Sequence, residues 1–405
     1  MTIDRPFLQS LYDEVPAGTQ ARFSQAVARI VDAKKKGGKV VVVTGSGPNI
    51  HEGVTTLIAE LMRIGLVDGV TTSSAVVSHE MGGTLDEVKR CQGGPLGLSP
   101  DHLPRGGEFE LTLMDDNAIR AISQHAPIDW DLIERLKKAP GRTIIKAAGN
   151  LGYPMGLWLE RFSQEILTIA HQHGCSFEEI AGLGADERTM IGAGARHGLP
   201  VIVSIPQLIG GGAVGLLLGD SLTLSERASR VAKLLASADV IIESGVALTQ
   251  EIHDGPFETY TGHGLWSFWQ GHFSFSLAGK SLIRIDLDPA LEKVWELERG
   301  GGAVQQAIAE GKPKTKMFAV PFRMEMSGFA RHEGSLPLIG DLGVLWPLLA
   351  WKCAEELDLE LTFLSYPQQS ALGKQMREKI VREVKPIDRD QMLRTLRFGG
   401  TQIKK

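Results

Sequence analysis

The sequence predicts an α/β protein with a mostly parallel sheet and helices on both faces. Three observations predict it. The run KVVVVT at Lys39–Thr44 is the continuous β-branched stretch that suits a strand buried on both faces. Strand-like runs alternate with helical patterns, which is typical of βαβ units with right-handed crossovers. Glycines follow several apolar runs, as they do where a strand turns into a helix beside a ligand.

The elements follow in chain order. The expected strands are Lys39–Thr44, Gly69–Thr72, Thr143–Ala147, Leu199–Ser204, Asp239–Glu243 and Ser281–Asp286. The clearest helical patterns between and after them are Leu157–His173, Arg188–His197, Ser225–Ala236 and Pro289–Glu298. Apolar residues from Val54 to Met62 recur at helical spacing and indicate a further helix after the first strand.

We expect three regions. Residues 1–37 form an N-terminal helical extension, in which the helix Thr19–Lys36 ends at a lysine run and two glycines. Residues 38–310 form a dinucleotide-binding α/β domain. Residues 311–405 form a C-terminal extension with an edge strand near Lys316–Met326, a helix at Leu342–Leu357 and a charged tail. Pro347 either kinks that helix or marks its true start.

Composition excludes several classes of protein. The net charge of −5 argues against a general nucleic-acid binder. The three cysteines are odd in number and widely spaced, which predicts no disulfide framework and a reducing compartment. The N-terminus lacks a signal-peptide core, and no apolar run reaches the roughly 18 residues of a membrane span. We expect a cytoplasmic protein without a membrane partner.

The turn after the first strand is the first candidate cofactor site. Gly45 and Gly47 can bring backbone N–H groups to a phosphate, and Ser46 and Asn49 add polar side chains beside them. The glycine spacing is not the G-x-G-x-x-G of ordinary dinucleotide-binding proteins. The alternative is a tight turn without a ligand.

Two further strand ends carry suitable side chains. Thr72, Ser73 and Ser74 follow the second strand, where they can donate to phosphate or ribose oxygens or simply cap the next helix. Asp286 ends the last strand, where a carboxylate could accept both hydroxyls of an adenosine ribose. Asp288 next to it is expected to cap the helix that Pro289 opens.

Other patterns carry weaker predictions. His171, His173 and Cys175 resemble a metal cluster, but positions two apart on a helix point to different faces, so we expect no metal site. The aromatic segment 262–275, which includes His263, either closes over a substrate, lines a subunit contact or packs in the core.

Several stretches resemble one known family. They are GSGPNIHEGVTTLIAELMRIGLVDGV, SSAVVSHEM, ERTMIGAGARHGLPVIVS, SADVIIESGVAL and SLIRIDLDPALEKVWELERGG. Together they resemble the deoxyhypusine-synthase-like NAD-binding proteins, and in particular the NAD-dependent ornithine cyclodeaminase domain of archaeal and cyanobacterial type. The likeness runs over residues 38 to 300 and is poorest in the middle.

The resemblance implies a Rossmann-like fold, an NAD cofactor and a homotetramer. NAD would be held by the three strand ends above, and also by residues after two later strands: Gly211, Gly212, Ser244 and Gly245. The implied reaction is the transient oxidation of a small amino acid or amine to an imine, as in a cyclodeaminase, lyase or aminoalkyl transferase.

The resemblance also implies catalytic residues. His79 and Glu80 match its His–acid pair, with a surface pair near a helix start as the alternative. His51 matches a cofactor or substrate contact, or else is structural. Glu187 lies in a family motif, although an acid at a helix start needs no functional explanation.

The chain also departs from the family. Ile209 and Gly210 stand where relatives place acids that recognise cationic amines, and Lys280 has the wrong context for an imine-forming lysine. We therefore do not expect deoxyhypusine synthesis, and the substrate stays open. Two alternatives remain. One is a nucleotide-binding domain like the middle domain of thiamine-diphosphate enzymes, which the strand at Ile283–Asp288 also resembles. The other is a non-catalytic NAD sensor.

Overall fold

A six-stranded parallel sheet forms the centre of the protein, in the order β6-β2-β1-β7-β8-β9. Its strands are β1 (Val40–Thr44), β2 (Gly69–Thr72), β6 (Val201–Val203), β7 (Val240–Ser244), β8 (Ser281–Asp286) and β9 (Ser335–Ile339). Every neighbouring pair is parallel. The computed structural model describes residues 3–45, 47–113, 116–124, 127–149, 156–204, 210–245, 277, 279–312 and 324–398. The predicted α/β class is confirmed.

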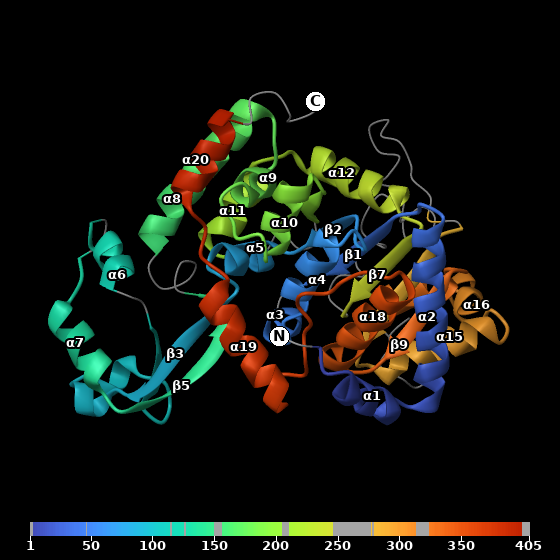
Figure 1. The fold of residues 1–405 in the computed structure, drawn as a ribbon, viewed down its shortest axis with the longest axis horizontal. Helices are drawn as coiled ribbons and strands as arrows, with labels where there is room; N and C mark the ends of the chain where they lie inside the picture. The colour runs from blue at the N-terminus through green and yellow to red at the C-terminus, as the bar shows by residue number, and fades with distance from the viewer. Residues whose placement is uncertain are drawn as a thin grey trace.

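Helices cover both faces of this sheet (Figure 1). Val40 and Val42 of β1 pack into one core with α2 (Ala17–Lys35), α4 (Val54–Arg63) and α18 (Leu342–Glu356). Val41 and Val43 pack into a second core with α12 (Leu224–Ser237), α15 (Pro289–Arg299) and α17 (Met324–Arg331). The alternating burial confirms that the KVVVVT run is a strand covered on both sides.

Further helices lie beside the parallel sheet or on a separate lobe. They are α1 (Arg5–Glu14), α3 (Pro48–His51), α5 (Ser74–Met81), α6 (Asp116–Ser123), α7 (Trp130–Lys138), α8 (Gly156–His173), α9 (Phe177–Gly182), α10 (Met190–His197), α11 (Ala213–Asp220), α16 (Ala303–Ala309), α19 (Ala371–Glu383) and α20 (Arg389–Phe398). Single 3₁₀ turns lie at Gly94–Leu96 and Pro100–His102. The predicted helices are confirmed, with their ends moved by one or two residues.

A second sheet forms a separate lobe, at the left of Figure 1. Its strands β3 (Leu85–Gln92), β4 (Glu108–Thr112) and β5 (Gly141–Ala147) are antiparallel, in the order β4-β3-β5. A small core under α7 contains Cys91 and Leu136. The predicted strand Thr143–Ala147 exists, but its expected place in the parallel sheet is wrong, because it pairs antiparallel with β3.

The C-terminal region corrects a second expectation. Of the strand predicted at Lys316–Met326, the residues that the structure describes begin helix α17 instead. The edge strand is β9, with Pro337 inside it, where an edge position tolerates the missing N–H. Helix α18 begins at Leu342 and continues through Pro347, so the proline does not mark its start.

The opposite edge strand, β6, is covered by a buried ion pair. Val203 donates its N–H to Glu178 Oε1 over 2.7 Å, and Arg227 Nη1 donates to the Val203 carbonyl over 3.0 Å. The two side chains also bond to each other over 2.6 Å and are fully buried. The pair therefore replaces a neighbouring strand and closes an edge that could otherwise recruit another chain.

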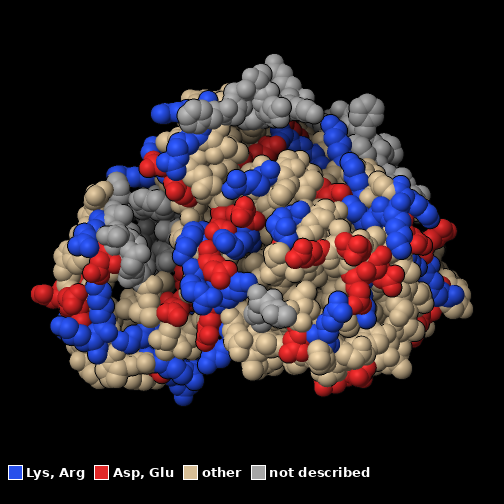
Figure 2. Space-filling model, in the orientation of Figure 1, with Lys and Arg blue, Asp and Glu red and all other residues tan. Residues whose placement is uncertain are grey.

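Two surface properties complete the description. Figure 2 shows Lys and Arg side chains interspersed with Asp and Glu over the face that it draws. Among the described residues, no helix is both long and apolar enough to cross a membrane.

Candidate functional site

The carboxyl edge of the parallel sheet carries a row of hydroxyl side chains. Thr72 ends β2, Thr44 ends β1, Ser244 ends β7 and Ser204 directly follows β6. Thr44 and Ser244 are register partners, and Ser204 donates its N–H to the Thr72 carbonyl over 3.3 Å. All four side chains are buried. The parallel topology thus brings together residues from four separate parts of the chain.

Three of these hydroxyls have no hydrogen-bond partner among the described residues: those of Thr44, Thr72 and Ser204. Leaving a buried hydroxyl unpaired costs about 1–3 kcal/mol, so a native protein rarely keeps several together without a use. They lie where ligands bind in open α/β sheets, outside the carboxyl ends of the strands. Contact of these buried hydroxyls with a ligand stays a prediction.

Open space adjoins this row at two glycine turns. Gly47 precedes α3 with φ +60°, and Gly245 follows β7 with φ +89°. A Cβ built on either glycine meets no described atom within 4 Å. Positive φ requires glycine at both places, and the free volume leaves room for a ligand beside the backbone. Ser46, predicted to bind cofactor, lies outside the described residues.

Asn49 and Ser244 belong to an internal network. Ser244 Oγ donates to Asn49 Oδ1 over 2.5 Å, Asn49 Nδ2 donates to the Ser244 carbonyl over 3.3 Å, and Trp346 Nε1 donates to Ser244 Oγ over 2.7 Å. These bonds fix the turn after β1 against the end of β7 and against α18. A direct contact of either residue with a cofactor stays a prediction.

The second predicted turn, with Thr72, Ser73 and Ser74, lies where the N-termini of α5 and α11 approach each other. Ser73 Oγ accepts the N–H of Val76 over 3.2 Å, so the capping alternative is confirmed for this residue. Ser74 Oγ donates to the Gly210 carbonyl over 3.0 Å. A Cβ on Gly211 would lie 2.6 Å from the Ser74 carbonyl oxygen, so the loop before α11 packs tightly on α5. Gly212 caps α11, and the α5 and α11 N-termini therefore approach each other.

Asp286 is engaged inside the protein. Its Oδ2 accepts two bonds from the Arg284 guanidinium, at 2.8 and 3.1 Å, and its Oδ1 accepts the N–H of Asp288. Both side chains of the pair are buried. Asp288 caps α15 by accepting the Ala290 N–H over 2.9 Å, as predicted. Contact between Asp286 and a ribose stays a prediction.

His79 and Glu80 are held by different partners. Glu80 is buried, and its carboxylate accepts the N–H groups of Met190 and Ile191 at the start of α10. Burial raises the pKa of Glu80 to about 7. His79 Nδ1 lies 2.5 Å from the Ala148 carbonyl oxygen, and burial lowers the pKa of its ring. Glu80 therefore binds the start of α10, whereas His79 contacts Ala148, just after β5.

The pKa of His51 is set by burial and by basic side chains. Burial lowers the pKa of His51, and the charges of Arg377, His79 and Lys146 lower it further. Arg377 comes from α19, in the region that sequence reasoning treated as a charged tail. No motif marks it, and only the path of α19 against β5 reveals it.

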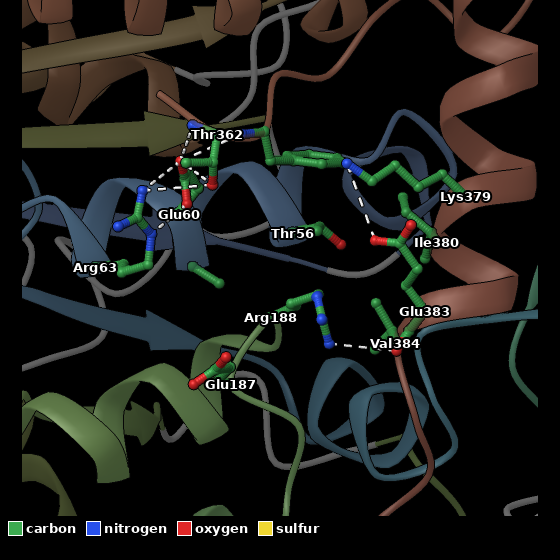
Figure 3. A pocket seen from close by; sticks show the side chains of 12 residues that line it. Thr56, Glu60, Arg63, Glu187, Arg188, Thr362, Lys379, Ile380, Glu383 and Val384 are labelled. Carbon is green, nitrogen blue, oxygen red and sulfur yellow. Dashed lines mark hydrogen bonds and ion pairs between the residues drawn. The ribbon is translucent and has the colours of Figure 1, made fainter. Parts of the chain in front are cut away.

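Glu187 lies apart from this group. Its side chain is 54% exposed, and it pairs with Arg196 over 3.6 Å just before α10. It lines a cavity of about 290 Å³ between α4, α19 and the segment before α10, with Arg63 and Lys379 (Figure 3). No other predicted site residue lines this cavity.

Other expectations can now be placed. Lys280 precedes β8, at the opposite edge of the sheet, and donates to the carbonyls of Ala236 and Ala238. That position separates it from the candidate site. His171 Nε2 lies 3.1 Å from the Asp220 carbonyl oxygen, and the described residues contain no group of three side chains that could hold a metal. Ile209 and segment 262–275 lie outside the described residues.

The comparisons with known proteins are limited to solved structures. No family model and no curated protein matches this chain. The matching structures include ArgZ, an arginine dihydrolase from cyanobacteria (TM-score 0.37, 13% identity, 84% of this chain and 32% of that one). They also include AgrE in complex with ornithine and NAD⁺ (TM-score 0.42, 16% identity, 84% of this chain and 34% of that one).

A third match is a protein of the LOR/SDH group from Methanococcus maripaludis S2 (TM-score 0.36, 12% identity, 85% of this chain and 70% of that one). This chain spans about a third of the length of ArgZ and of AgrE. At these scores the likeness bears on neither activity nor ligand, which must be argued from the chain itself.

Proposed function

We propose that this chain binds NAD across the carboxyl ends of β6, β2, β1 and β7 and oxidises a small amino acid or amine transiently to an imine. The observation that carries the proposal is the set of three buried hydroxyls without described partners, Thr44, Thr72 and Ser204, on neighbouring strands. A dinucleotide offers ribose hydroxyls and phosphate oxygens that can pair with all three at once.

The glycine turns provide the rest of the proposed cofactor site. Gly47 leaves open space beside its backbone after β1, and Gly245 does so after β7. Gly45 is proposed to contact the cofactor beside them. The N-terminus of α5, with Ser73 and Ser74, and that of α11, with Gly211 and Gly212, present N–H groups and dipoles that favour phosphate. When bound, NAD would supply a reversible hydride acceptor at this edge.

His79 is the proposed proton acceptor. Its lowered pKa leaves the ring neutral at physiological pH. Because Nδ1 faces a carbonyl oxygen, that nitrogen carries the ring proton, and a neutral imidazole is the form that can take a proton from an amine. The proposed reaction is that of a lyase or deaminase, or an aminoalkyl transfer. The proposal also includes a homotetramer.

Identification of the bound nucleotide tests the proposal. The purified protein is denatured and the released small molecule is identified, and NAD is titrated into nucleotide-free protein. NAD is the expected result. Release of FAD or ADP would favour the alternative of a domain like the middle domain of thiamine-diphosphate enzymes. If no nucleotide is released and NAD does not raise the melting temperature, the cofactor proposal fails.

Turnover separates an enzyme from a sensor. Amino acids and polyamines are screened with NAD for ammonia release, on the wild type, on His79→Ala and on His173→Ala as an exposed control. We expect activity in the wild type and the control, and about 100-fold less in His79→Ala, the typical contribution of a general base. NAD binding without turnover would favour the sensor. Equal activity in His79→Ala would remove His79 from the mechanism.

A further inference from the structure

A cavity lies between α4, α19 and the segment before α10, apart from the proposed cofactor site (Figure 3). Its described lining residues include Glu187 but none of the polar residues at the carboxyl edge of the parallel sheet. The volume of about 290 Å³ is close to the lower limit of the roughly 300–1,000 Å³ of ligand pockets. The cavity therefore suits a small molecule, and not a dinucleotide.

One wall of the cavity is held in place by the buried carboxylate of Glu60. Arg63 donates to it through Nε over 2.7 Å and through Nη2 over 2.8 Å, and the Thr362 hydroxyl donates over 2.9 Å. Burial alone would raise the pKa of Glu60, but these hydrogen bonds lower it below its ordinary value. Two other charged lining residues already have ion partners: Arg188 pairs with Asp186 over 3.0 Å, and Glu187 with Arg196 over 3.6 Å. The wall is thus formed without a ligand, and these charges are paired within the protein.

Thr56, in the first turn of α4, has a hydroxyl without a partner at this cavity. The residue is 3% exposed, and its Oγ1 is buried and forms no hydrogen bond with any described residue. Figure 3 shows the side chain pointing away from α4 toward α19, into the space that the lining residues surround. Because an unpaired buried hydroxyl is costly, this one fits a ligand atom in the cavity.

Lys379 and Glu383 place opposite charges one turn apart on α19, at the same cavity. Nζ of Lys379 and Oε2 of Glu383 are 3.9 Å apart, which is too far for a hydrogen bond. Nζ also lies 5.9 Å from the centre of the Phe363 ring, and it forms no hydrogen bond with the residues that the structure describes. Glu383 accepts a hydrogen bond from Arg382 through Oε1, over 3.3 Å. The lysine ammonium and Oε2 therefore keep their capacity to bind charges of the opposite sign.

We infer that this cavity binds a free α-amino acid in its zwitterionic form. The carboxylate of the ligand accepts hydrogen bonds from Lys379 Nζ and from the Thr56 hydroxyl, and its ammonium donates to Glu383 Oε2. In an α-amino acid both charged groups are attached to one carbon, which matches two opposite charges on neighbouring turns of a helix. A ligand with a single charge would leave either Lys379 or Glu383 without a new partner. Ile380 and Ala59 provide apolar surface for the side chain of the ligand.

Calorimetric titration of the full-length protein without NAD tests this site. The probes are the common amino acids, with propionate and propylammonium as ligands that carry only one of the two charges. We expect an amino acid to bind about tenfold more tightly than either single-charge probe. Thr56→Val, which keeps the shape of the side chain, should weaken that binding about tenfold, and so should Lys379→Gln. Equal binding of a single-charge probe, or no binding of any amino acid, would overturn the inference.

Thr55→Val is the matched control, because Thr55 is adjacent on α4, buried and without a described partner, but does not line the cavity. It should leave amino-acid binding unchanged. Lys379 is partly exposed, so Lys379→Gln tests the site even if the core variant changes stability. Unchanged binding in Thr56→Val and Lys379→Gln, or an equal loss in Thr55→Val, would mean that the amino acid binds elsewhere and would contradict the inference.

NAD titrations of the same variants separate this site from the proposed function. We expect Thr56→Val to bind NAD like the wild type. If Thr56→Val weakens NAD binding as strongly as amino-acid binding, the cavity belongs to the cofactor site, and the inference is wrong. If the wild type binds no NAD but binds an amino acid through Thr56 and Lys379, the cavity site stands and the proposed function fails.

Discussion

The indole of Trp346 donates its N–H to Ser244 Oγ over 2.7 Å, although 102 residues separate them in the chain. Ser244 in turn donates to Asn49, in the turn after β1. Trp346 is buried in α18. The C-terminal region therefore fixes the shape of the carboxyl edge, where the candidate cofactor site lies.

Replacing this tryptophan tests that link. Trp346→Phe keeps an aromatic ring but removes the donor to Ser244, so we expect it to lower the free energy of unfolding by about 1–3 kcal/mol. Trp351→Phe is a control on the same helix, because Trp351 Nε1 is buried without a partner among the described residues. Urea unfolding of both variants measures the difference. Equal losses would mean that the bond to Ser244 contributes nothing.

The parallel sheet could be predicted from sequence, whereas the antiparallel lobe could not. Buried strands such as VVVVT and SLIRID consist of apolar, β-branched runs with few other interpretations. In β3 the buried residues Leu85, Val88 and Cys91 are spaced by three, a helical interval, and charged residues fill the positions between them. Strand β9 could not be predicted either, because it contains Pro337, and a proline argues against a strand unless the strand lies at an edge.

Sequence also located the candidate site only in part. Strand ends are visible as polar residues after apolar runs, which is why Thr72, Ser244 and Asp286 could be singled out. Which of their oxygens are already bonded depends on partners that only the folded chain reveals. Ser244 is bonded by Trp346, which is 102 residues away, and Asp286 by Arg284 on the same strand. Thr44 and Ser204 were part of the predicted strands, but only their unpaired hydroxyls in the folded protein draw attention to them.

The ion pair between Glu178 and Arg227 at the edge of β6 predicts that substitutions at these two positions have strongly non-additive effects on stability. Glu178→Met leaves the Arg227 guanidinium buried without its counter-charge, and we expect a loss of about 3–5 kcal/mol in the free energy of unfolding. Arg227→Met should cost a similar amount. The double variant Glu178→Met/Arg227→Met should cost much less than the sum.

The control for this pair is an ion pair on the protein surface. Glu226→Gln breaks an ion pair with Arg230 on the protein surface, and should change stability by about 0.5 kcal/mol or less. Denaturant unfolding of the wild type, the two single variants and the double variant completes the cycle for positions 178 and 227, and Glu226→Gln is measured beside them. Additive losses at positions 178 and 227 would contradict the structural pairing.

Glu80 predicts a specific pH dependence of stability. Its pKa rises from 4.5 to about 7 on folding, because burial disfavours the ionised carboxylate. The folded chain thus holds a proton that the unfolded chain releases, and this contribution to stability falls as pH rises through that window. Relative to Glu80→Gln, the wild type should lose on the order of 3 kcal/mol between about pH 5 and about pH 8.

Urea unfolding at several pH values measures this difference. Glu187→Gln, which changes an exposed carboxylate, serves as the control. If the difference in unfolding free energy between the wild type and Glu80→Gln does not change with pH, the buried carboxyl does not take up a proton on folding.

The central claim is that the unpaired hydroxyls of the carboxyl edge bind NAD. The most direct test compares the NAD affinities of two variants, Ser204→Ala and Ser365→Ala. Both serines are buried and have no described partner, but only Ser204 lies at the edge. Neither variant should destabilise the NAD-free protein, since each removes an unpaired group. We predict that Ser204→Ala binds NAD about tenfold more weakly and that Ser365→Ala binds it like the wild type. Unchanged NAD binding in Ser204→Ala would contradict the account.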